Sequence, residues 1–298
     1  MSINETNALW NVWNDRDPIE IPNTEYTLKG FSVAALRTNF YIKELGVMLD
    51  GGLSANIYAD HIFITHAHSD HIASLPFHLY SVKPESKIQI YAPEEACKNL
   101  DQFIQSLLMI NMEFPDGELN NNENQIVNEK CYDLIPLKPS TFELNIKNKV
   151  FKIEAIKCYH GVPCLGYGFI EKRNKLKQEY LGLSPKEIGM LKKRGIDICI
   201  EVEFPIFCFL GDTSKEILND TSLEKYKTIM IECTFITDDD IEQANKTSHM
   251  HWKSLEPYIL SHPSITFILY HFSRRYKKSD LEIFFKKMDL QNVIAWIN

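Results

Sequence analysis

Apolar and polar positions divide the chain into short apolar runs and longer segments with helical spacing. Runs rich in β-branched and aromatic residues predict strands. The first two, Phe31–Leu36 and Phe40–Leu49, are expected to form a hairpin that ends at Asp50-Gly51-Gly52. Further strands are expected at 61–65, 88–91, 151–157, 166–170, 206–210, 228–232, 265–270 and 293–297.

Apolar residues three and four positions apart predict the helices. The longest is expected to begin at Pro93, because proline suits the first helical turn and Glu94 and Glu95 suit the positive end of the helix dipole. Residues 1–27 show no clear period and predict an irregular lead-in, whereas the Asn- and Glu-rich residues 116–130 predict a surface loop. Shorter helices are expected at 70–80, 185–194, 252–261 and 280–287.

The order of these elements predicts the fold class. Strands come first, helices are interleaved with them, and strands follow again. This order is typical of an α/β protein in which two sheets pack face to face under helices, a four-layer α/β/β/α sandwich. We expect a single domain over residues 1–298, with the lead-in at 1–27 and a basic insertion at 171–195. No repeat of fixed period is visible.

The composition indicates the cellular compartment in which the protein is expected. Hydrophobic residues make up 44% of the chain, enough for a sizeable core. No segment has eighteen consecutive apolar residues, so we expect no membrane span, and the acidic, Arg-poor N-terminus favours neither a secretory nor an organellar leader. The seven cysteines include no C-x-x-C pair, which predicts reduced thiols. We therefore expect a cytoplasmic protein, with the nucleus as the alternative.

The charge is unfavourable for a nucleic-acid partner, except in one segment. With 32 Lys and Arg against 40 Asp and Glu, the formal net charge is −8, and phosphate attraction supplies much of the affinity for nucleic acids. Residues 171–195 are the exception, because their eight Lys and Arg outnumber three Glu and give a net charge of +5. This segment is either a solvated helical face or a phosphate-binding surface.

One loop carries the clearest chemistry. Directly after the apolar run Ile62-Phe63-Ile64-Thr65, the chain reads His66-Ala67-His68-Ser69-Asp70-His71. Three imidazoles and one carboxylate within six residues can hold two cations side by side, and neutral imidazole suits zinc. The alternative is a His-rich surface loop, but a position at the end of a buried strand is where a metal loop needs to lie.

Other potential ligands follow other predicted strands. His160 follows the strand 151–157, Asp212 follows the strand that ends at Leu210, and His271 follows the strand that ends at Tyr270. Ligand sites in α/β proteins favour the carboxyl ends of strands. We therefore group these residues with the loop at 66–71 into one candidate metal site.

Together these residues and their neighbours resemble the metallo-β-lactamase superfamily and, within it, ribonuclease Z in its short, plant-type form. The resemblance extends from about Phe31 to the C-terminus. Besides the ligands, it rests on these segments: His160-Gly-Val-Pro-Cys-Leu-Gly-Tyr-Gly, Lys175-Leu-Lys-Gln-Glu-Tyr-Leu-Gly-Leu, Glu187-Ile-Gly-Met-Leu-Lys-Lys-Arg-Gly, Glu232-Cys-Thr-Phe with His249-Met-His251, and His271-Phe-Ser-Arg-Arg-Tyr.

The resemblance implies a metallo-β-lactamase sandwich with two Zn²⁺ per subunit, with Mn²⁺ or another divalent metal as the alternative. Asp212 would bridge the two ions. The remaining ligands would be His66, His68 and His160 on one ion, and Asp70, His71 and His271 on the other.

The implied activity is that of an endoribonuclease that removes the 3′ trailer from precursor tRNA and leaves a tRNA 3′-hydroxyl. A zinc-bound hydroxide would attack the phosphodiester, with Asp70 as the base and water-orienting group. His249, oriented by Glu232, would protonate the departing oxygen, although spacing does not separate His249 from His251. Ser273 and Arg275 would contact the scissile phosphate.

The resemblance also gives the basic insertion a role. Residues 171–195 would form an arm that grips the tRNA through its phosphates, and the arm of one subunit would serve the site of the other, which implies a homodimer. The arm cations expected to bind substrate are Lys175, Lys177, Lys192, Lys193 and Arg194.

Other functions fit parts of the sequence. A small-molecule phosphodiesterase, or another dizinc hydrolase on the same scaffold, is the main alternative. The Glu232–His249 pair and the basic arm argue against it. A non-catalytic RNA-binding protein is disfavoured by the complete ligand set, and a di-iron redox protein is disfavoured because no flavin module follows.

Overall fold

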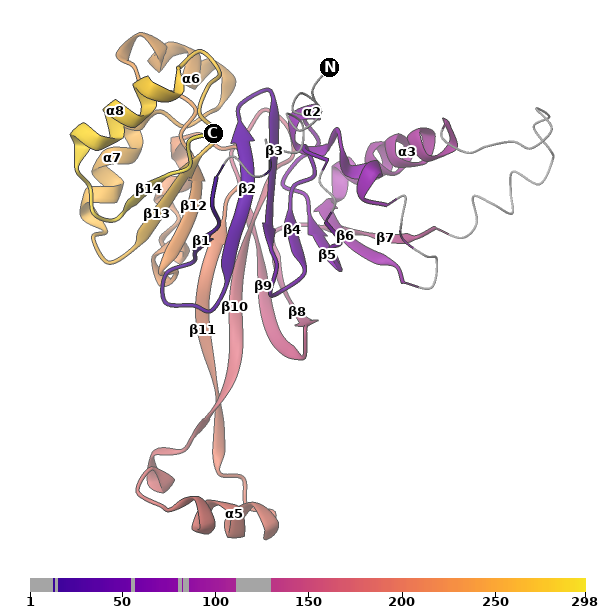
Figure 1. The fold of residues 1–298 in the computed structure, drawn as a ribbon, viewed down its shortest axis with the longest axis vertical. Helices are drawn as coiled ribbons and strands as arrows, with labels where there is room; N and C mark the ends of the chain where they lie inside the picture. The colour runs from indigo at the N-terminus through magenta and orange to yellow at the C-terminus, as the bar shows by residue number, and fades with distance from the viewer. Residues whose placement is uncertain (1–12, 14–15, 55–56, 80–81, 83–85, 111–129) are drawn as a thin grey trace, which may run out of the picture.

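The computed structural model describes residues 13, 16–54, 57–79, 82, 86–110 and 130–298. Within these residues, two sheets of seven strands face each other and helices cover their outer sides (Figure 1), which confirms the predicted α/β/β/α sandwich. The N-terminal sheet runs, in spatial order, through β1 (Ile19–Glu20), β2 (Thr27–Val33), β3 (Arg37–Ile42), β4 (Val47–Leu49), β5 (His61–Phe63), β6 (Ile88–Pro93) and β7 (Tyr132–Leu137).

The C-terminal sheet contains the other seven strands. Strands β11 to β14 run parallel to one another, as do β4 to β7 in the first sheet, so both sheets have a parallel half whose strands end at a common edge. The spatial order is β14 (Val293–Ala295), β13 (Thr266–Tyr270), β12 (Thr228–Glu232), β11 (Cys199–Phe209), β10 (Leu165–Leu176), β9 (Lys149–Lys157) and β8 (Ser140–Ile146).

An aromatic core fills the space between the two sheets. Phe40 of β3 meets Tyr270 of β13 edge to face, with ring centroids 5.4 Å apart. Phe63 of β5 meets Phe169 of β10 in the same way at 5.2 Å. All four side chains are fully buried. Edge-to-face pairs of this kind add to the stabilisation from burial, so the sheets are fixed against each other close to the strand ends.

Helices pack on the outer face of each sheet. On the first sheet, α3 (Glu94–Ile110) buries Leu100 and Ile104, four residues apart, against apolar residues of β5 and β6. On the second, α7 (Trp252–Ser261) and α8 (Lys278–Met288) bury Leu255 and Leu281 against β12 and β13. Short helical elements α2 (Ser69–Ile72) and α6 (Ile241–Thr247) follow strand ends.

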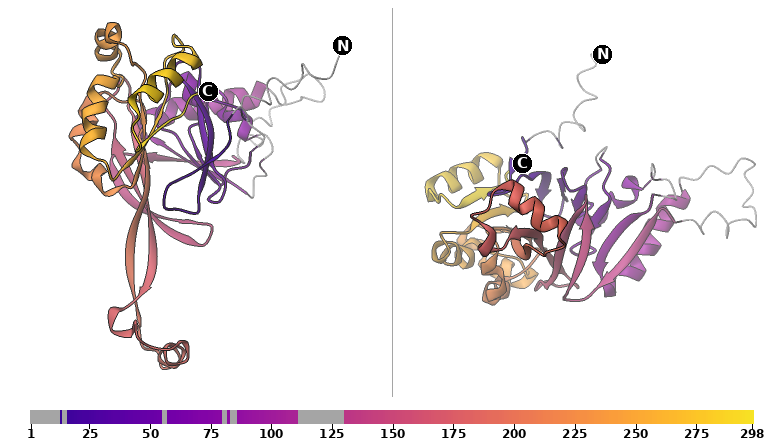
Figure 2. Two further views of the ribbon diagram at one scale, coloured as in Figure 1. Left: turned by 60° about the vertical axis from the view of Figure 1, so that its left-hand side comes forward. Right: turned by 90° about the horizontal axis from the view of Figure 1, so that it is seen from below.

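A long two-stranded ribbon projects from the sandwich (Figures 1 and 2). Strand β10 pairs with both β9 and β11 as far as Lys172, and beyond that residue it pairs with β11 alone. The ribbon ends in α5 (Pro185–Lys193), whose N-terminus has a reciprocal capping box between Ser184 and Glu187. The predicted basic insertion is therefore an arm, although its strands extend beyond 171–195.

Several predicted boundaries were wrong. The strand predicted at 40–49 is broken by a turn at Gly46, whose φ of 62° is one that glycine adopts readily, so β3 and β4 are separate strands. The helix predicted at 70–80 is split into α2 and a 3₁₀ turn at Leu75–His78, up to the end of the described residues there. Strand β11 begins at Cys199 rather than at 206, and β7, β8 and α6 were not predicted.

Two predictions concern segments that are described only in part. Within the lead-in at 1–27, β1 pairs with β2, so the described part is not wholly irregular. The surface loop predicted at 116–130 lies outside the described residues, apart from its last one. Among the helices that the structure describes, none combines the length and the apolar character needed to cross a bilayer.

Candidate metal centre and active site

The loop that carries His66 to His71 is held by both sheets. Its first residue after β5, Ile64, accepts a hydrogen bond from the hydroxyl of Tyr167 on β10 at 2.7 Å. The carbonyl of Thr65 accepts from the amide of Leu165 at 2.9 Å. The amide and hydroxyl of Thr65 donate to the buried carboxylate of Asp50 at the end of β4. The loop therefore leaves the core in a fixed direction.

Close backbone packing positions the second half of this loop. The amide of Gly51 donates to the carbonyl of His71 at 2.7 Å. A Cβ atom on Gly52 would lie 1.7 Å from the carbonyl oxygen of Asp70, so a side chain at this position would push α2 away. The Asp50-Gly51-Gly52 turn that ends β4 thus sets where Asp70 and His71 point.

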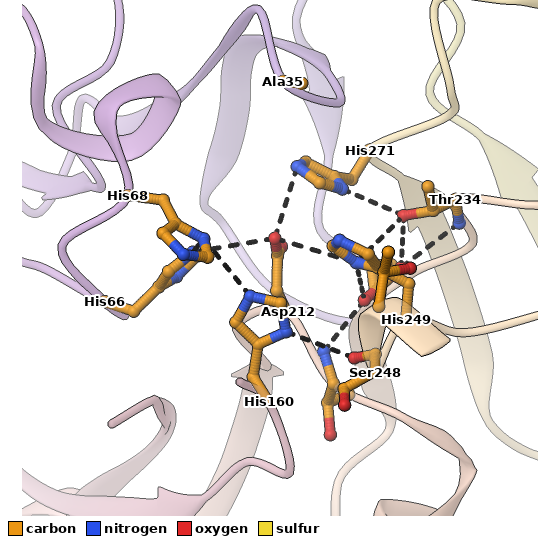
Figure 3. A network of polar contacts seen from close by, with 12 residues as sticks. Ala35, His66, His68, His160, Asp212, Thr234, Ser248, His249 and His271 are labelled. Atoms are coloured by element: carbon orange, nitrogen blue, oxygen red, sulfur yellow. Dashed lines mark hydrogen bonds and ion pairs between the residues drawn. The ribbon is translucent and has the colours of Figure 1, made fainter. Parts of the chain in front are cut away.

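The structure brings together all seven predicted metal ligands. Figure 3 shows the histidine rings around the carboxylate of Asp212, which lies at the carboxyl end of β11. Its Oδ2 atom is 3.6 Å from Nε2 of His66, 3.6 Å from Nε2 of His71 and 3.5 Å from Nε2 of His271. Two subsets of these ligands each lie within 4.8 Å: His66, His68, His160 and Asp212; and Asp70, His71 and His271. A third such group joins Asp212 and His271 to His249.

The histidines are oriented from behind by neighbouring groups. Nδ1 of His71 is 2.8 Å from Asp50 Oδ2, and Nδ1 of His160 is 3.2 Å from the carbonyl of Ser248. Nδ1 of His66 and of His271 lies 3.0 Å from the hydroxyls of Thr65 and Thr234, respectively. Such partners fix the ring and leave the opposite nitrogen free to bind a metal.

The unpaired atoms in the cluster fit divalent cations. Oδ1 of Asp212 is buried and has no hydrogen-bond partner. Inward-facing ring nitrogens approach one another at 3.0 Å for His66 and His68 and at 3.4 Å for His71 and His271. Five imidazoles with two carboxylates are a donor set that suits zinc and similar ions. The cluster is therefore a divalent-metal site.

The electrostatics of the cluster favour bound cations. Burial, with His71 nearby, lowers the pKa of His66 well below its usual value. Burial opposes charge on His71, but Asp212 and Asp50 outweigh it and raise its pKa well above the usual value. Burial alone would raise the pKa of Asp70, yet the hydrogen bond from His271 and the charge of His71 lower it to about 2. This buried carboxylate is therefore ionised at neutral pH, and its negative charge attracts cations.

Beside the metal cluster lies the predicted Glu232–His249 pair. Glu232 ends β12 and is completely buried, and its Oε1 is 2.8 Å from Nδ1 of His249. The amide of Thr213 donates to the same oxygen, and the hydroxyl of Thr234 donates to the other one. Burial lowers the pKa of His249, but the Glu232 charge outweighs this effect and raises it to about 9. Without bound metal, the imidazole is thus protonated at neutral pH.

His251 has a different environment. Its Nε2 is 2.8 Å from the carbonyl of Thr237, and its Nδ1 accepts from the amide of Lys253 at the N-terminus of α7. Both ring nitrogens are therefore occupied by backbone groups. His249, in contrast, has its Nδ1 3.9 Å from Oδ2 of Asp212. The sequence spacing did not tell these two histidines apart as candidate acids, and their contacts do.

Ser273 and Arg275 follow His271, but the structure ties them to each other and to Asp240. Nε of Arg275 donates to the hydroxyl of Ser273 at 3.2 Å, and its Nη1 forms an ion pair with Asp240. Its guanidinium also lies 5.0 Å from the ring centroid of Phe235. About half of the Arg275 side chain is exposed, so it is open to a further anion.

The arm cations are not near the metal cluster of their own chain. Figure 1 shows α5 and α2 at opposite ends of the molecule. Lys175 lies over the ring of Phe204 at 4.4 Å, and Lys177 donates to the carbonyl of Asp197, so both belong to the ribbon. At the tip, Lys186 and the three predicted cations Lys192, Lys193 and Arg194 are exposed and form no ion pair among the described residues.

Three residues of the site were missed in the sequence. Asp50 was taken only as the end of a strand, Thr234 as part of a motif, and Asp240 was not considered. The acidic residue directly before Gly51-Gly52 was a usable signal for Asp50. Neither Thr234 nor Asp240 carries such a signal, because their roles depend on how the loops after β12 and β13 pack together.

Comparison with known proteins places the chain in a family. No protein-family model matches it. Among curated proteins, it is 29% identical to tRNase Z TRZ1 of Arabidopsis thaliana, over 86% of this chain and 89% of that protein. It is 30% identical to the chloroplastic tRNase Z TRZ2 of the same plant, over 86% of this chain and 70% of that protein. A nuclear ribonuclease Z from Triticum aestivum is 31% identical over 58% of this chain and 91% of that protein.

Solved structures agree on the fold. The short form of human tRNase Z (ELAC1) aligns with a TM-score of 0.54 and 18% identity, over 91% of this chain and 96% of that one. The metallo-β-lactamase fold protein YhfI from Bacillus subtilis gives 0.55 and 13%, with the same coverage. The sandwich is thus a metallo-β-lactamase fold. With the identity and coverage of the plant relatives, the chain belongs to the ribonuclease Z (tRNase Z) family.

Proposed function

We propose that this protein is a metal-dependent endoribonuclease that removes the 3′ trailer from precursor tRNA and leaves a 3′-hydroxyl. The observation that carries the proposal is the Glu232–His249 pair, joined at hydrogen-bond distance beside a seven-residue metal cluster. Membership of the ribonuclease Z family supports the substrate. The proposed compartment is the cytoplasm or the nucleus. The composition supports it, and one relative is named a nuclear ribonuclease Z.

Two zinc ions are the proposed cofactor, with Mn²⁺ as the alternative. His66, His68 and His160 would hold one ion, and Asp70, His71 and His271 the other, with Asp212 between them. The two compact ligand groups support this division. When bound, such a pair lowers the pKa of a water molecule and neutralises charge on a phosphodiester.

Asp70 is the proposed base and water-orienting group. Its Oδ2 accepts a hydrogen bond from the amide of Ala35 at 2.9 Å and lies 3.3 Å from Nε2 of His271. These contacts hold the carboxylate in one orientation, with its ionised form favoured. A carboxylate fixed in this way accepts a hydrogen bond from the attacking water and directs its oxygen toward phosphorus.

His249 is the proposed acid. Cleavage on the tRNA side of the scissile phosphorus releases a 3′ oxygen that needs a proton, while the phosphate stays on the trailer. The carboxylate of Glu232 holds Nδ1 of His249, so Nε2 is the nitrogen left to donate. Ser273 and Arg275 would contact the scissile phosphate, with Asp240 holding the guanidinium until substrate arrives.

The arm is proposed to bind tRNA in a homodimer. The tip of the arm lies at the end of the molecule away from the metal cluster (Figure 1). An arm in this position does not reach its own active site, which supports action at the site of a second subunit. Lys192, Lys193 and Arg194 are the cations best placed to contact phosphates, and Lys175 and Lys177 would support the ribbon.

The test is turnover of a defined precursor tRNA, measured beside a chromogenic phosphodiester and a β-lactam. We expect the zinc-loaded protein to cleave the tRNA best, and His249→Ala to lose roughly 10²- to 10⁴-fold in kcat. His251→Ala is the matched control, although it removes a helix cap, so its unfolding temperature is measured as well. Preferred turnover of the small diester would support the alternative phosphodiesterase, and tRNA binding without cleavage would support a non-catalytic protein.

A further inference from the structure

We propose that the hollow beside His160 is a nucleobase subsite in which Tyr159 stacks on a base next to the scissile phosphate. This inference rests on the proposed function and extends it to a residue that directly contacts the substrate. The hollow has a volume of about 640 Å³, which lies in the range of ligand sites in proteins. One of its walls is formed by His160, a metal ligand, so a nucleotide that occupies it adjoins the reacting phosphate.

Tyr159 has the properties of a stacking platform. The residue is 40% exposed, and it follows the buried Cys158 in the loop between β9 and β10. Its amide donates to the hydroxyl of Thr213 at 2.9 Å, and its carbonyl accepts from the amide of Ser214 at 2.8 Å. The backbone of Tyr159 is therefore fixed to the loop that carries Asp212. A half-exposed ring on a fixed backbone is suited to stacking, because every base has a π-face.

The surroundings of the ring favour a base over a second phosphate. Nζ of Lys157 lies 5.2 Å from the centroid of the Tyr159 ring. The same hollow is lined by two exposed carboxylates, Glu95 and Glu216, so its charged side chains other than His160 sum to −1. A phosphate would meet more negative than positive charge there. A base would meet the ring, the apolar Val162 and carboxylates that accept hydrogen bonds from amino groups.

The experiment compares three precursor tRNAs: an intact one and two with a single abasic site, immediately 5′ or 3′ of the scissile phosphate. Tyr159→Ala is expected to lose roughly tenfold in kcat/KM on the intact substrate, the effect typical of one stacked base. On one of the abasic substrates, the same variant should match the wild-type protein, because there is no base to stack. Tyr159→Phe should retain the wild-type rate on all three.

Two further variants keep the test independent of folding. Gly161 lines the hollow, and a Cβ atom on it would meet no atom within 4 Å, so Gly161→Leu adds bulk to the wall from a position that is free of contacts. It should reduce cleavage of the intact substrate, whereas Gly161→Ala should not. Tyr58→Ala, at another exposed tyrosine outside the hollow, is the matched control. Zinc content is measured for every variant, because Tyr159 and Gly161 flank His160.

The outcomes separate this proposal from the proposed function. If the wild-type protein leaves precursor tRNA intact, the function itself is overturned. If the wild-type protein cleaves and zinc-loaded Tyr159→Ala cleaves equally well, only the subsite is overturned. An equal loss for Tyr159→Ala on all three substrates also overturns it, since the ring would then act without a base.

Discussion

Asp50 and Thr234 hold metal-facing rings from behind, and neither was assigned this role from the sequence. Asp50 is fully buried and is shared by the ring of His71 and the hydroxyl of Thr65. Thr234 links Glu232, His249 and His271 through one hydroxyl. At the scale of residues, the site is therefore one network in which the proposed metal ligands and the proposed acid share a partner.

Replacing Asp50 tests this network. Asp50→Asn keeps the size of the side chain but places an amide where the ring of His71 and the hydroxyl of Thr65 both need an acceptor. We expect zinc affinity to fall roughly 10- to 100-fold, the usual cost of losing such a partner. Competition with a chromogenic chelator measures the affinity. Asp133→Asn, at an exposed ion pair with Lys87, is the control, and equal affinity in both variants would contradict the prediction.

The pKa of His249 makes a second residue-scale prediction. In protein freed of divalent cations, its imidazole should titrate at about 9, against an ordinary 6.5, because Glu232 outweighs the effect of burial. A raised pKa stabilises the fold fully below about 6.5, and this contribution is lost as the pH rises through about 9. Proton NMR titration gives the value. Glu232→Gln should move it down, and an unchanged value in that variant would contradict the assignment.

At the scale of elements, the arm differs most from what its sequence suggested. The predicted segment 171–195 carried a net charge of +5, but the ribbon continues along β11 and adds Asp197, Glu201 and Glu203. Over 171–203 the net charge is therefore +2. Lys172 pairs with Glu201 of β11 and with Glu143 of β8, so part of the basic charge is neutralised at the base of the ribbon. The free positive charge is concentrated at the tip.

This distribution predicts which cations bind tRNA. Replacing Lys192, Lys193 and Arg194 together by Ala should raise KM for precursor tRNA and flatten its dependence on salt, because phosphate contacts are lost. Cleavage of a small phosphodiester should change little. A control variant with Lys175 and Lys177 replaced by Gln should keep most of the salt dependence, since both side chains have partners in the ribbon. An unaltered KM in the tip variant would contradict this role of the arm.

The elements that the sequence predicted well are those with a clear apolar period. The helix predicted at 252–261 matches α7, and the one at 185–194 matches α5 to within one residue. The missed strands are mostly exposed or half-buried. The outer half of the ribbon has no core to face, so although apolar and charged residues alternate at the start of β11 as in a strand, they form no buried apolar run. Strand β8 is largely exposed and was missed for the same reason.

At the scale of the whole molecule, the site forms because the carboxyl ends of strands from both sheets lie close together. The ligands come from loops that follow β5, β9, β11 and β13, and the aromatic core fixes these strands against each other. The positions of the ligands after strands were visible in the sequence. The packing of one sheet on the other was not, and it determines that Asp50 reaches His71 and that Tyr167 reaches Ile64.

Removal of metal should therefore destabilise the entire fold. Bound ions relieve the buried charges at this junction and bind only the folded chain. At a concentration one hundred times the dissociation constant, a ligand adds about 2.7 kcal/mol. This corresponds to roughly 5 °C in the melting temperature of a domain of this size. Calorimetry with zinc and with chelator measures the difference. Equal melting temperatures would contradict a metal site built from both sheets.

The central claim is that the metal cluster and the Glu232–His249 pair cut precursor tRNA at the start of its trailer. Sequencing both ends of the products tests it most directly. We expect one cut, with a 3′-hydroxyl on the tRNA and a 5′-phosphate on the trailer, and with the product nearly absent for His249→Ala loaded with zinc. A 3′-phosphate on the tRNA, or cuts scattered along the RNA, would contradict it.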